Sequence, residues 1–281
     1  MRVVRAAEEM RALCRAAKAR SGRLGFVPTM GALHAGHLSL VRAARTKSAV
    51  VAASIFVNPA QFGPEEDYTR YPRNLERDCG LFENEGVELV FAPEAGEMYR
   101  EDSASWVIVD GLSDRLCGRS RPGHFRGVAT VVAKLFHIVE PDVAFFGQKD
   151  AAQVAIIGRM VRDLKFALAI EVCPIVREPD GLALSSRNAY LGPAERKAAL
   201  VLFRSLERAR GLFEGGERNS FELMQAARHE FLAEPAVRLD YFEVVDPDSL
   251  EPQPEISKKT LVAVAANVGC TRLIDNILLE P

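Results

Sequence analysis

The chain has 281 residues, of which 48% are hydrophobic and 26% charged, and this profile is typical of a globular protein with a sizeable core. Its 36 basic and 38 acidic side chains leave a formal net charge of -2, so the composition gives no reason to expect a nucleic-acid partner. Because no apolar run reaches membrane-spanning length and the first residues lack the apolar centre of a signal peptide, we expect a cytosolic protein with no membrane partner.

The predicted elements alternate between helix and strand at first and then change to helices followed by strands. In the alternating part, apolar spacing predicts helices and strands in the following order: helix 4–20, strand 24–27, a helix opened by residues 34–37, strand 49–57, helix 74–85, strand 87–92, a more exposed strand 105–109, helix 125–139, strand 141–146, a helix that follows the turn at 147–150, and strand 167–173. The remainder predicts two helices and then a small antiparallel sheet: helices 193–213 and 220–232, strands 239–245, 260–266 and 271–279.

This order predicts the fold class. A continuous apolar strand such as 49–57 is typical of a parallel sheet covered on both faces. We therefore expect an α/β protein with a Rossmann-like, doubly wound parallel sheet, followed by a second, smaller α+β C-terminal domain. The Pro- and Gly-containing segment after residue 173 is the expected connection, which gives domains 1–175 and 176–281.

The most informative stretch joins the first predicted strand to the next helix, where residues 28–37 read Pro-Thr-Met-Gly-Ala-Leu-His-Ala-Gly-His. Gly31 and Gly36 are expected to let a ligand approach the backbone. His34 and His37 lie on one side of the first helical turn, where unpaired N–H groups and partial positive charge attract phosphate. Two imidazoles there would donate to charge developing on an attacked α-phosphate. The alternative is a pair of histidines that only cap the helix.

A second turn, after strand 49–57, carries Asn58 and Gln61. Ligands bind beyond the carboxyl ends of strands in an open parallel sheet, and amides bond hydroxyl and carboxylate groups without adding charge. The alternative is a turn whose polar residues face water.

A third turn, after strand 141–146, carries Lys149, Asp150 and Gln153. Lys149 is placed to meet a phosphate as a point charge, and Asp150 either caps the next helix or accepts a ribose hydroxyl. Gln153, one turn later, is expected to face the same cleft. The alternative is a solvated turn with a capping aspartate.

Two further segments concern substrates and partners. The arginine-rich stretch 112–123 is either a mobile basic lid over phosphates or a solvated turn. His124 follows it and is expected to line the same pocket as Gln61. The apolar face of helix 125–139 is wide enough to contact both the sheet and a partner subunit.

After the predicted connection, Ser185, Ser186 and Arg187 supply two hydroxyls and a fixed cation. Such a cluster on a second domain would clamp a triphosphate from the opposite side. The alternative is a Ser-Ser helix cap beside a surface arginine.

Other site types are disfavoured by what the sequence lacks. It has no G-x-x-x-x-G-K-[ST] phosphate loop and no G-x-G-x-x-G dinucleotide fingerprint. The five cysteines are scattered, without metal-ligand spacing, so we expect free, small, buried thiols and no metal site made of protein ligands alone.

Several segments, in one order and covering nearly the whole chain, resemble the pantothenate synthetase family of the H-x-G-H nucleotidylyltransferase superfamily. They read V-P-T-M-G-A-L-H-x-G-H, F-V-N-P-x-Q-F, R-P-G-H-F-R-G-V-A-T-V-V, F-F-G-Q-K-D-x-x-Q and V-R-E-x-D-G-L-A-x-S-S-R-N. The resemblance implies an ATP-dependent ligase that joins (R)-pantoate to β-alanine through pantoyl adenylate, releasing AMP and pyrophosphate. It also implies a homodimer, and Mg2+ bound with ATP mostly through phosphate oxygens.

The resemblance also implies residue roles, and no protein nucleophile is required. The catalytic residues would be His34, His37, Lys149 and Arg187, with His37 as proton donor. The ATP site would comprise Pro28, Thr29, Met30, Gly31, Ala32, Leu33, His34, Ala35, Gly36, His37, Gly147, Gln148, Lys149, Asp150, Val176, Leu184, Ser185, Ser186 and Arg187. Pantoate and β-alanine would contact Gln61, Gln153, Asn58 and His124. Asp78 is a weaker candidate, for a water-mediated contact to the metal.

Departures from the family pattern at Ala60, Ala151 and Ala152 affect pocket shape but remove no group that the chemistry needs. Two other functions remain open: a related nucleotidylyltransferase acting on a phosphate ester, and a nucleotide-sensing module without turnover. The two-glutamine site suits a small acid with uncharged hydroxyl groups, whereas a phosphorylated acceptor would need more cations, and this favours the ligase.

Overall fold

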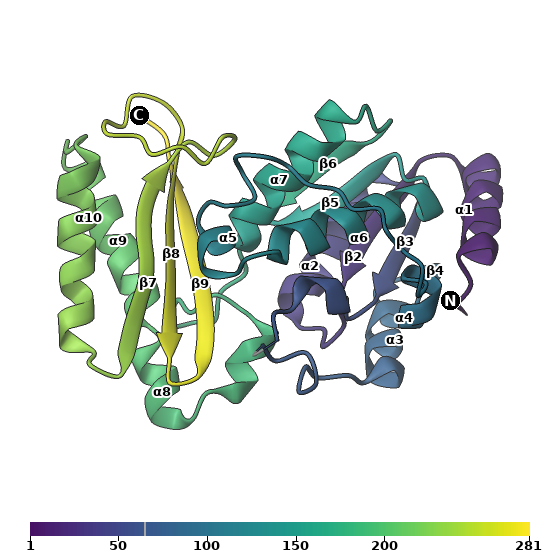
Figure 1. The fold of residues 1–281 in the computed structure, drawn as a ribbon, viewed down its shortest axis with the longest axis horizontal. Helices are drawn as coiled ribbons and strands as arrows, with labels where there is room; N and C mark the ends of the chain where they lie inside the picture. The colour runs from purple at the N-terminus through teal and green to yellow at the C-terminus, as the bar shows by residue number, and fades with distance from the viewer. Residues whose placement is uncertain (65) are drawn as a thin grey trace.

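The computed structural model describes residues 1–64 and 66–281 (Figure 1). Its first part is a six-stranded sheet in the order β1-β4-β3-β2-β5-β6, in which every pair of neighbours is parallel. The strands are β1 (Arg2–Val4), β2 (Leu24–Thr29), β3 (Val50–Ile55), β4 (Leu89–Phe91), β5 (Val143–Gly147) and β6 (Ala169–Cys173). We call this part, from β1 to β6, the N-terminal lobe.

Helices cover both faces of the sheet, as predicted for a doubly wound fold. Along β2, Phe26 packs with α1, α6 and α7 on one face, and Val27 packs with α2 and α3 on the other. This alternation follows from the two-residue period of a strand. The helical elements of this lobe are α1 (Ala7–Ser21), α2 (Ala35–Lys47), η1 (Pro59–Gln61), α3 (Leu75–Asn84), α4 (Ala95–Met98), α5 (Cys117–Ser120), α6 (His124–Val139), η2 (Gln148–Asp150) and α7 (Ala151–Asp163).

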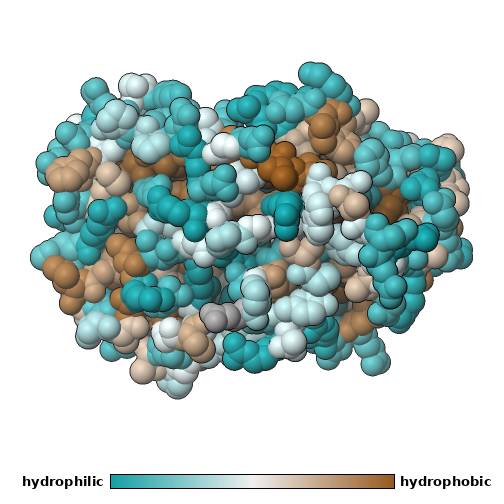
Figure 2. All heavy atoms as spheres, in the orientation of Figure 1, coloured by the Kyte–Doolittle hydropathy of each residue, from teal (hydrophilic) through white to brown (hydrophobic). Residues whose placement is uncertain are grey.

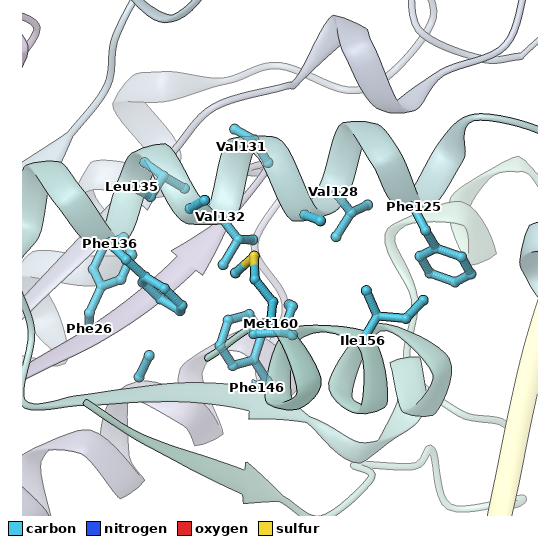
Figure 3. Close-up of a cluster of buried hydrophobic side chains, with 14 of the residues drawn as sticks. Phe26, Phe125, Val128, Val131, Val132, Leu135, Phe136, Phe146, Ile156 and Met160 are labelled. Atoms are coloured by element: carbon cyan, nitrogen blue, oxygen red, sulfur yellow. The ribbon is translucent and has the colours of Figure 1, made fainter. Parts of the chain in front are cut away.

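Helix α6 lies at the centre of this core rather than at a subunit surface. Figure 3 shows Val132 and Phe136 of α6 beside Met160 of α7 and Phe146 of β5, with Val131 on the opposite side of the helix. Val131 is also buried, at 6% exposure. The apolar face of α6 is therefore covered within the same chain.

The second part, from η3 to β9, is the C-terminal lobe, with helices packed on a three-stranded antiparallel sheet, β7-β8-β9. Its elements are η3 (Ser186–Tyr190), α8 (Pro193–Ala198), α9 (Val201–Glu214), α10 (Ser220–His229), η4 (Glu230–Ala233), β7 (Val237–Val245), β8 (Thr260–Val268) and β9 (Thr271–Leu279). In β8, Val262 and Val264 pack among the helices, whereas Leu261 and Ala263 pack in the core cluster of the N-terminal lobe. The two lobes thus share a core.

Several predicted elements differ from the structure. Residues 105–109 form no strand, and the main-chain N–H of Val107 donates to Oγ1 of Thr130 at 2.9 Å. The helix expected over 193–213 is interrupted between α8 and α9. The short strand β1 was not predicted, because three residues carry too little periodicity, and Cys270 is exposed rather than buried.

The surface agrees with the composition. Figure 2 shows a face covered mainly by hydrophilic residues, with hydrophobic residues in scattered patches. Within the described residues, no helix combines the length and the apolar character needed to cross a membrane.

Candidate active site

The strand order places a crevice at the carboxyl ends of β2 and β5. These strands are neighbours, yet the chain continues from β2 to β3 on one side and from β5 to β6 on the other. Ligands bind at such a switch point in open α/β sheets. A cavity of about 230 Å³ lies here, and an adjoining cavity of about 500 Å³ extends toward β8 and β9.

The smaller cavity brings together residues from all the turns that the sequence singled out. The predicted residues that line it are Pro28, Thr29, Met30, His34, Gly36, His37, Asn58, Gln61, His124, Gly147, Lys149, Asp150, Gln153, Val176, Leu184, Ser185, Ser186 and Arg187. The other predicted ATP-site residues do not line it: Gly31, Ala32, Leu33, Ala35 and Gln148. Of these, Leu33 is packed in the core, and the Gln148 side chain bonds Asn276 of β9.

His34 and His37 both cap helix α2 and line the cavity. Nδ1 of His34 accepts from the N–H of Gly36 at 3.1 Å, and Nδ1 of His37 accepts from the N–H of His34 at 3.3 Å. A nitrogen that accepts carries no proton, so each neutral ring keeps its proton on Nε2. The ring centroids are 4.1 Å apart. The capping alternative is thus correct as local structure, and the caps fix two neighbouring N–H donors.

Both imidazoles are neutral at neutral pH. Burial lowers the pKa of His34 to about 4, and the charge of Lys149 contributes to the shift. Burial also lowers the pKa of His37 to about 3, with smaller contributions from His34 and Lys149. The structure therefore places the Lys149 ammonium near two uncharged donors.

Asp78 supports the loop that precedes these histidines. Its two carboxylate oxygens accept from the N–H groups of Ala32 at 2.7 Å and Leu33 at 3.0 Å, and the residue is 1% exposed. It lies beneath the loop and does not line the cavity, which argues against the suggested metal contact.

A Cβ at Gly36 would lie 2.9 Å from Cε1 of His34, so this glycine makes room for the imidazole itself.

Gln61 lines the cavity, and its side-chain amide is hydrogen-bonded to two neighbouring side chains. Its Nε2 donates to Sδ of Met30 at 2.8 Å, and its Oε1 accepts from Nδ2 of Asn58 at 3.2 Å. Asn58 is buried and also donates to the main-chain oxygen of Gly127 at 3.1 Å. The amide of Asn58 thus positions Gln61, which is the freer of the two for a ligand.

His124 is tied to the protein through both ring nitrogens. Nδ1 donates to the carbonyl of Gln61 at 2.8 Å, and Nε2 accepts from Nη1 of Arg121 at 2.9 Å. Burial, followed by the charge of Arg121, lowers the pKa of His124 to about 4. Arg121 is in turn bidentate to Glu66 at 2.6 and 2.7 Å. His124 thus lines the same cavity as Gln61, as predicted, and its two bonds hold the Gln61 carbonyl and Arg121 in place.

Segment 112–123 is bound to both lobes. Arg119 pairs with Glu243 of β7, while Arg121 pairs with Glu66. Because these ion pairs hold the loop in place, it is neither a mobile lid nor a solvated turn, the two alternatives that the sequence left open.

Arg187 lines the cavity, and its guanidinium is already paired with a carboxylate. Nε and Nη2 donate to the two oxygens of Asp67 at 3.0 and 2.9 Å. Ser185 accepts from the N–H of Arg187 at 3.3 Å, and Ser186 shares a hydrogen bond with the Tyr71 hydroxyl at 3.1 Å. Asp67 and Tyr71 were missed because the charged stretch they occupy has no local signal for a partner more than a hundred residues away.

Lys149 and Gln153 are the polar side chains of the site that neighbouring described residues hold least. Nζ of Lys149 approaches Oδ1 of Asp150 only to 3.8 Å. Asp150 makes no capping bond to α7, and Gln153 lines both cavities. In the described part of the chain, no group of three or more His, Cys, Asp or Glu side chains is arranged to hold a metal ion.

Comparisons with known proteins agree with this arrangement. A family model described as pantoate-beta-alanine ligase matches residues 2–278. A pantothenate synthetase of Koribacter versatilis (strain Ellin345) is 58% identical over 280 residues, covering 100% of this chain and 96% of that relative. Another, from Thermotoga neapolitana, is 54% identical over 279 residues, covering 99% and 100%.

Solved structures lead to the same family. Pantothenate synthetase from Thermus thermophilus has a TM-score of 0.95 at 48% identity, over 100% of both chains. A pantoate-beta-alanine ligase from Francisella tularensis, complexed with beta-gamma ATP and beta-alanine, has a TM-score of 0.81 at 32% identity, over 99% of this chain and 97% of that one. Because the family model, the relatives and the fold agree over nearly the whole chain, the chain belongs to the pantoate-beta-alanine ligase family.

Proposed function

We propose that this ATP-dependent ligase makes and consumes pantoyl adenylate in the cavity at the ends of β2 and β5. The observation that carries the proposal is the convergence of His34, His37, Lys149 and Arg187 on that one cavity. A site of this kind works by positioning and charge stabilisation, without a protein nucleophile. The complex of the Francisella tularensis relative with beta-gamma ATP and beta-alanine supports the same substrates here.

The reaction has two balanced steps. In the first, a pantoate carboxylate oxygen attacks the α-phosphorus of ATP, the new P–O bond forms, and the bond to pyrophosphate breaks. In the second, the amine of β-alanine attacks the acyl carbon, the C–N bond forms, AMP leaves and the amine loses a proton.

The cavity-lining donors take charge-stabilising roles in the first step. Nε2–H groups of His34 and His37 would donate to the α-phosphate and the departing pyrophosphate. Because both rings are neutral, His37 would act as a hydrogen-bond donor rather than as the proton donor expected from the sequence. Lys149 would stabilise the pyrophosphate charge. Arg187 would clamp the phosphates by sharing or exchanging its bond to Asp67.

Pantoate fits the remaining wall of the cavity. Gln61 and Gln153 would bond its hydroxyl and carboxylate groups. The cavity surface also includes Phe56, Val128 and Leu135, an apolar wall suited to the branched carbon of pantoate. Mg2+ would arrive with ATP and be held mostly by phosphate oxygens, which is usual for this ion.

The proposal includes an organisation into domains 1–175 and 176–281, a cytosolic location supported by the use of ATP, and a homodimer. Segment 105–109, which forms no strand and pairs with none among the described residues, supports the dimer. Its Trp106 and Ile108 are 43% and 57% exposed, and they alternate with the less exposed Val107 and Val109. A second copy pairing along this segment would cover both side chains.

The function is tested by pantoate-dependent exchange of labelled pyrophosphate into ATP, together with AMP formation. We expect exchange only with pantoate, and net AMP only when β-alanine is also present. AMP formation that ignores both acids would remove the ligase assignment. ATP binding without any exchange would identify a nucleotide sensor, and transfer to a phosphate ester would identify another nucleotidylyltransferase.

A further inference from the structure

Asn276 of β9 reaches from the C-terminal lobe to the turn that carries Lys149. Its Nδ2 donates to the main-chain oxygens of Gln148 at 2.9 Å and Lys149 at 3.0 Å, and its Oδ1 accepts from Nε2 of Gln148 at 3.0 Å. Only this orientation is chemically consistent, because a flipped amide would set its oxygen against two carbonyl oxygens. Asn276 is 2% exposed, so solvent cannot replace these bonds.

The strand is itself anchored at this point. Asp275, which is 3% exposed, accepts from both terminal nitrogens of Arg177 at 2.6 and 2.9 Å and from the N–H of Asn276 at 2.7 Å. Arg177 lies in the connection that leads to Arg187. The adjacent residues Asp275 and Asn276 therefore join the turn of Lys149 to the segment of Arg187.

The Lys149 ammonium depends on its main chain for its position. Among the described residues its Nζ makes no hydrogen bond, and its pairing with Asp150 is at 3.8 Å. The stem of lysine is flexible, so the region that an unanchored ammonium can reach is set by where the main chain places its Cα. The clamp by Asn276 acts on that backbone.

We propose that Asn276 is a positioning residue for adenylation, which sets where the Lys149 ammonium lies relative to the Nε2–H groups of His34 and His37. This inference rests on the proposed function, because it gives Asn276 a task in the first step only. Misplacement of a catalytic group by about 1 Å can slow a reaction on the order of 100-fold.

The first test compares the two half-reactions in Asn276→Ala and Asn276→Asp. The aspartate keeps the size of the side chain but loses both donors. We expect kcat for pantoate-dependent pyrophosphate exchange to fall on the order of 10- to 100-fold in both variants, with a smaller change in KM for ATP. The second step, measured with supplied pantoyl adenylate and β-alanine, should keep its wild-type rate. Asn276→Ser, which retains one donor, should recover part of the loss.

The second test is a double-mutant cycle with Lys149→Ala. If Asn276 acts through Lys149, then Asn276→Ala should slow exchange no further once Lys149 is truncated. The matched control is Asn219→Ala, which removes a hydrogen bond from the N–H of Phe221 to Asn219 at the start of α10, outside both cavities. It should lower stability and leave exchange unchanged.

Failure of this inference is distinguishable from failure of the proposed function. If the wild type shows no pantoate-dependent exchange, the proposed function fails. If the wild type exchanges but Asn276→Ala exchanges at the same rate, slows both steps equally, or multiplies the Lys149→Ala defect, the positioning role alone is overturned. Should Asn276→Ala not fold, Asn276→Asp and Asn276→Ser decide by the same criteria.

Discussion

At the scale of single residues, the surroundings of a side chain decide its chemistry more than its type does. His34, His37 and His124 are all neutral because burial opposes their charged forms, yet their hydrogen bonds give them different tasks. His34 and His37 accept at Nδ1, and their Nε2–H groups bond no other described residue, whereas both ring nitrogens of His124 are bonded, to Gln61 and Arg121.

Truncation of the charge-stabilising groups should slow the first step. We expect His37→Ala and Lys149→Ala each to reduce pantoate-dependent exchange by roughly 10² to 10³, the loss typical of one transition-state donor. Circular dichroism should confirm that both variants are folded. Exchange at the wild-type rate in either variant would refute the role given to that residue.

The depressed histidine pKa values predict a loss of stability on mild acidification. The unfolded chain has imidazoles of ordinary pKa, about 6.5, so between about pH 6.5 and 4 it binds more protons than the folded chain. The free energy of unfolding should therefore fall as pH decreases from about 7 to 5, and should fall less in His37→Gln. The carboxyl groups of Glu66 and Asp67 contribute little to this fall, because their ordinary pKa values of 4.5 and 3.8 lie below the range. In the folded chain, against the opposing effect of burial, the hydrogen bonds from Arg121 and Arg187 lower these two pKa values further.

Proton NMR gives an independent reading of the same prediction. The ring resonances of His34 and His37, assigned with the single glutamine variants, should not titrate between about pH 5.5 and 8. A midpoint near 6.5 for either ring, the ordinary value, would show that burial does not depress its pKa.

At the scale of elements, close packing of α6 against η1 places Gln61, one of the two glutamines proposed to bind pantoate. A Cβ at Gly127 of α6 would lie 2.1 Å from the oxygen of Ala60 and 2.7 Å from the nitrogen of Gln61. No side chain other than hydrogen fits without moving η1. The first turn of α2 shows the same dependence, since the ring of His34 occupies the space above Gly36.

Gly127→Ala should therefore displace Gln61 and raise KM for pantoate by roughly tenfold or more, with a smaller effect on KM for ATP. The matched control is Gly158→Ala in α7, where an added Cβ meets nothing within 4 Å. That variant should gain about 0.4–1 kcal/mol in urea unfolding and keep its kinetics. Unchanged pantoate kinetics in Gly127→Ala would show that η1 does not position the substrate.

At the scale of the whole molecule, the lobes meet through an apolar layer and through ion pairs. Leu261, Ala263 and Ala265 of β8 face the core of the N-terminal lobe, which explains why β8 is a continuous apolar run rather than an alternating one. The Arg187–Asp67 and Arg119–Glu243 pairs cross the same junction. The site is therefore assembled from both lobes.

The proposed homodimer is tested at this scale by sedimentation velocity. The wild type should sediment with twice the chain mass, and Trp106→Ser combined with Ile108→Ser should shift it toward the monomer by removing buried apolar area. The control is Leu232→Ser in η4, where the side chain is 75% exposed in the C-terminal lobe. A wild-type monomer, or a dimer indifferent to both changes at 106 and 108, would refute pairing along this segment.

The sequence by itself determined most of the helices and strands, though not β1 or the absence of a strand at 105–109, together with the two kinds of sheet and the turns that carry Gln61, Lys149 and the paired histidines. It did so because apolar periodicity, glycines and helix starts are local properties of the chain. Only the tertiary structure decided that Asp67 holds Arg187, that Asn276 clamps the Lys149 turn, and that the histidines are uncharged. Those outcomes depend on burial and on partners more than a hundred residues away, or on a desolvated site that exists only once both lobes have packed.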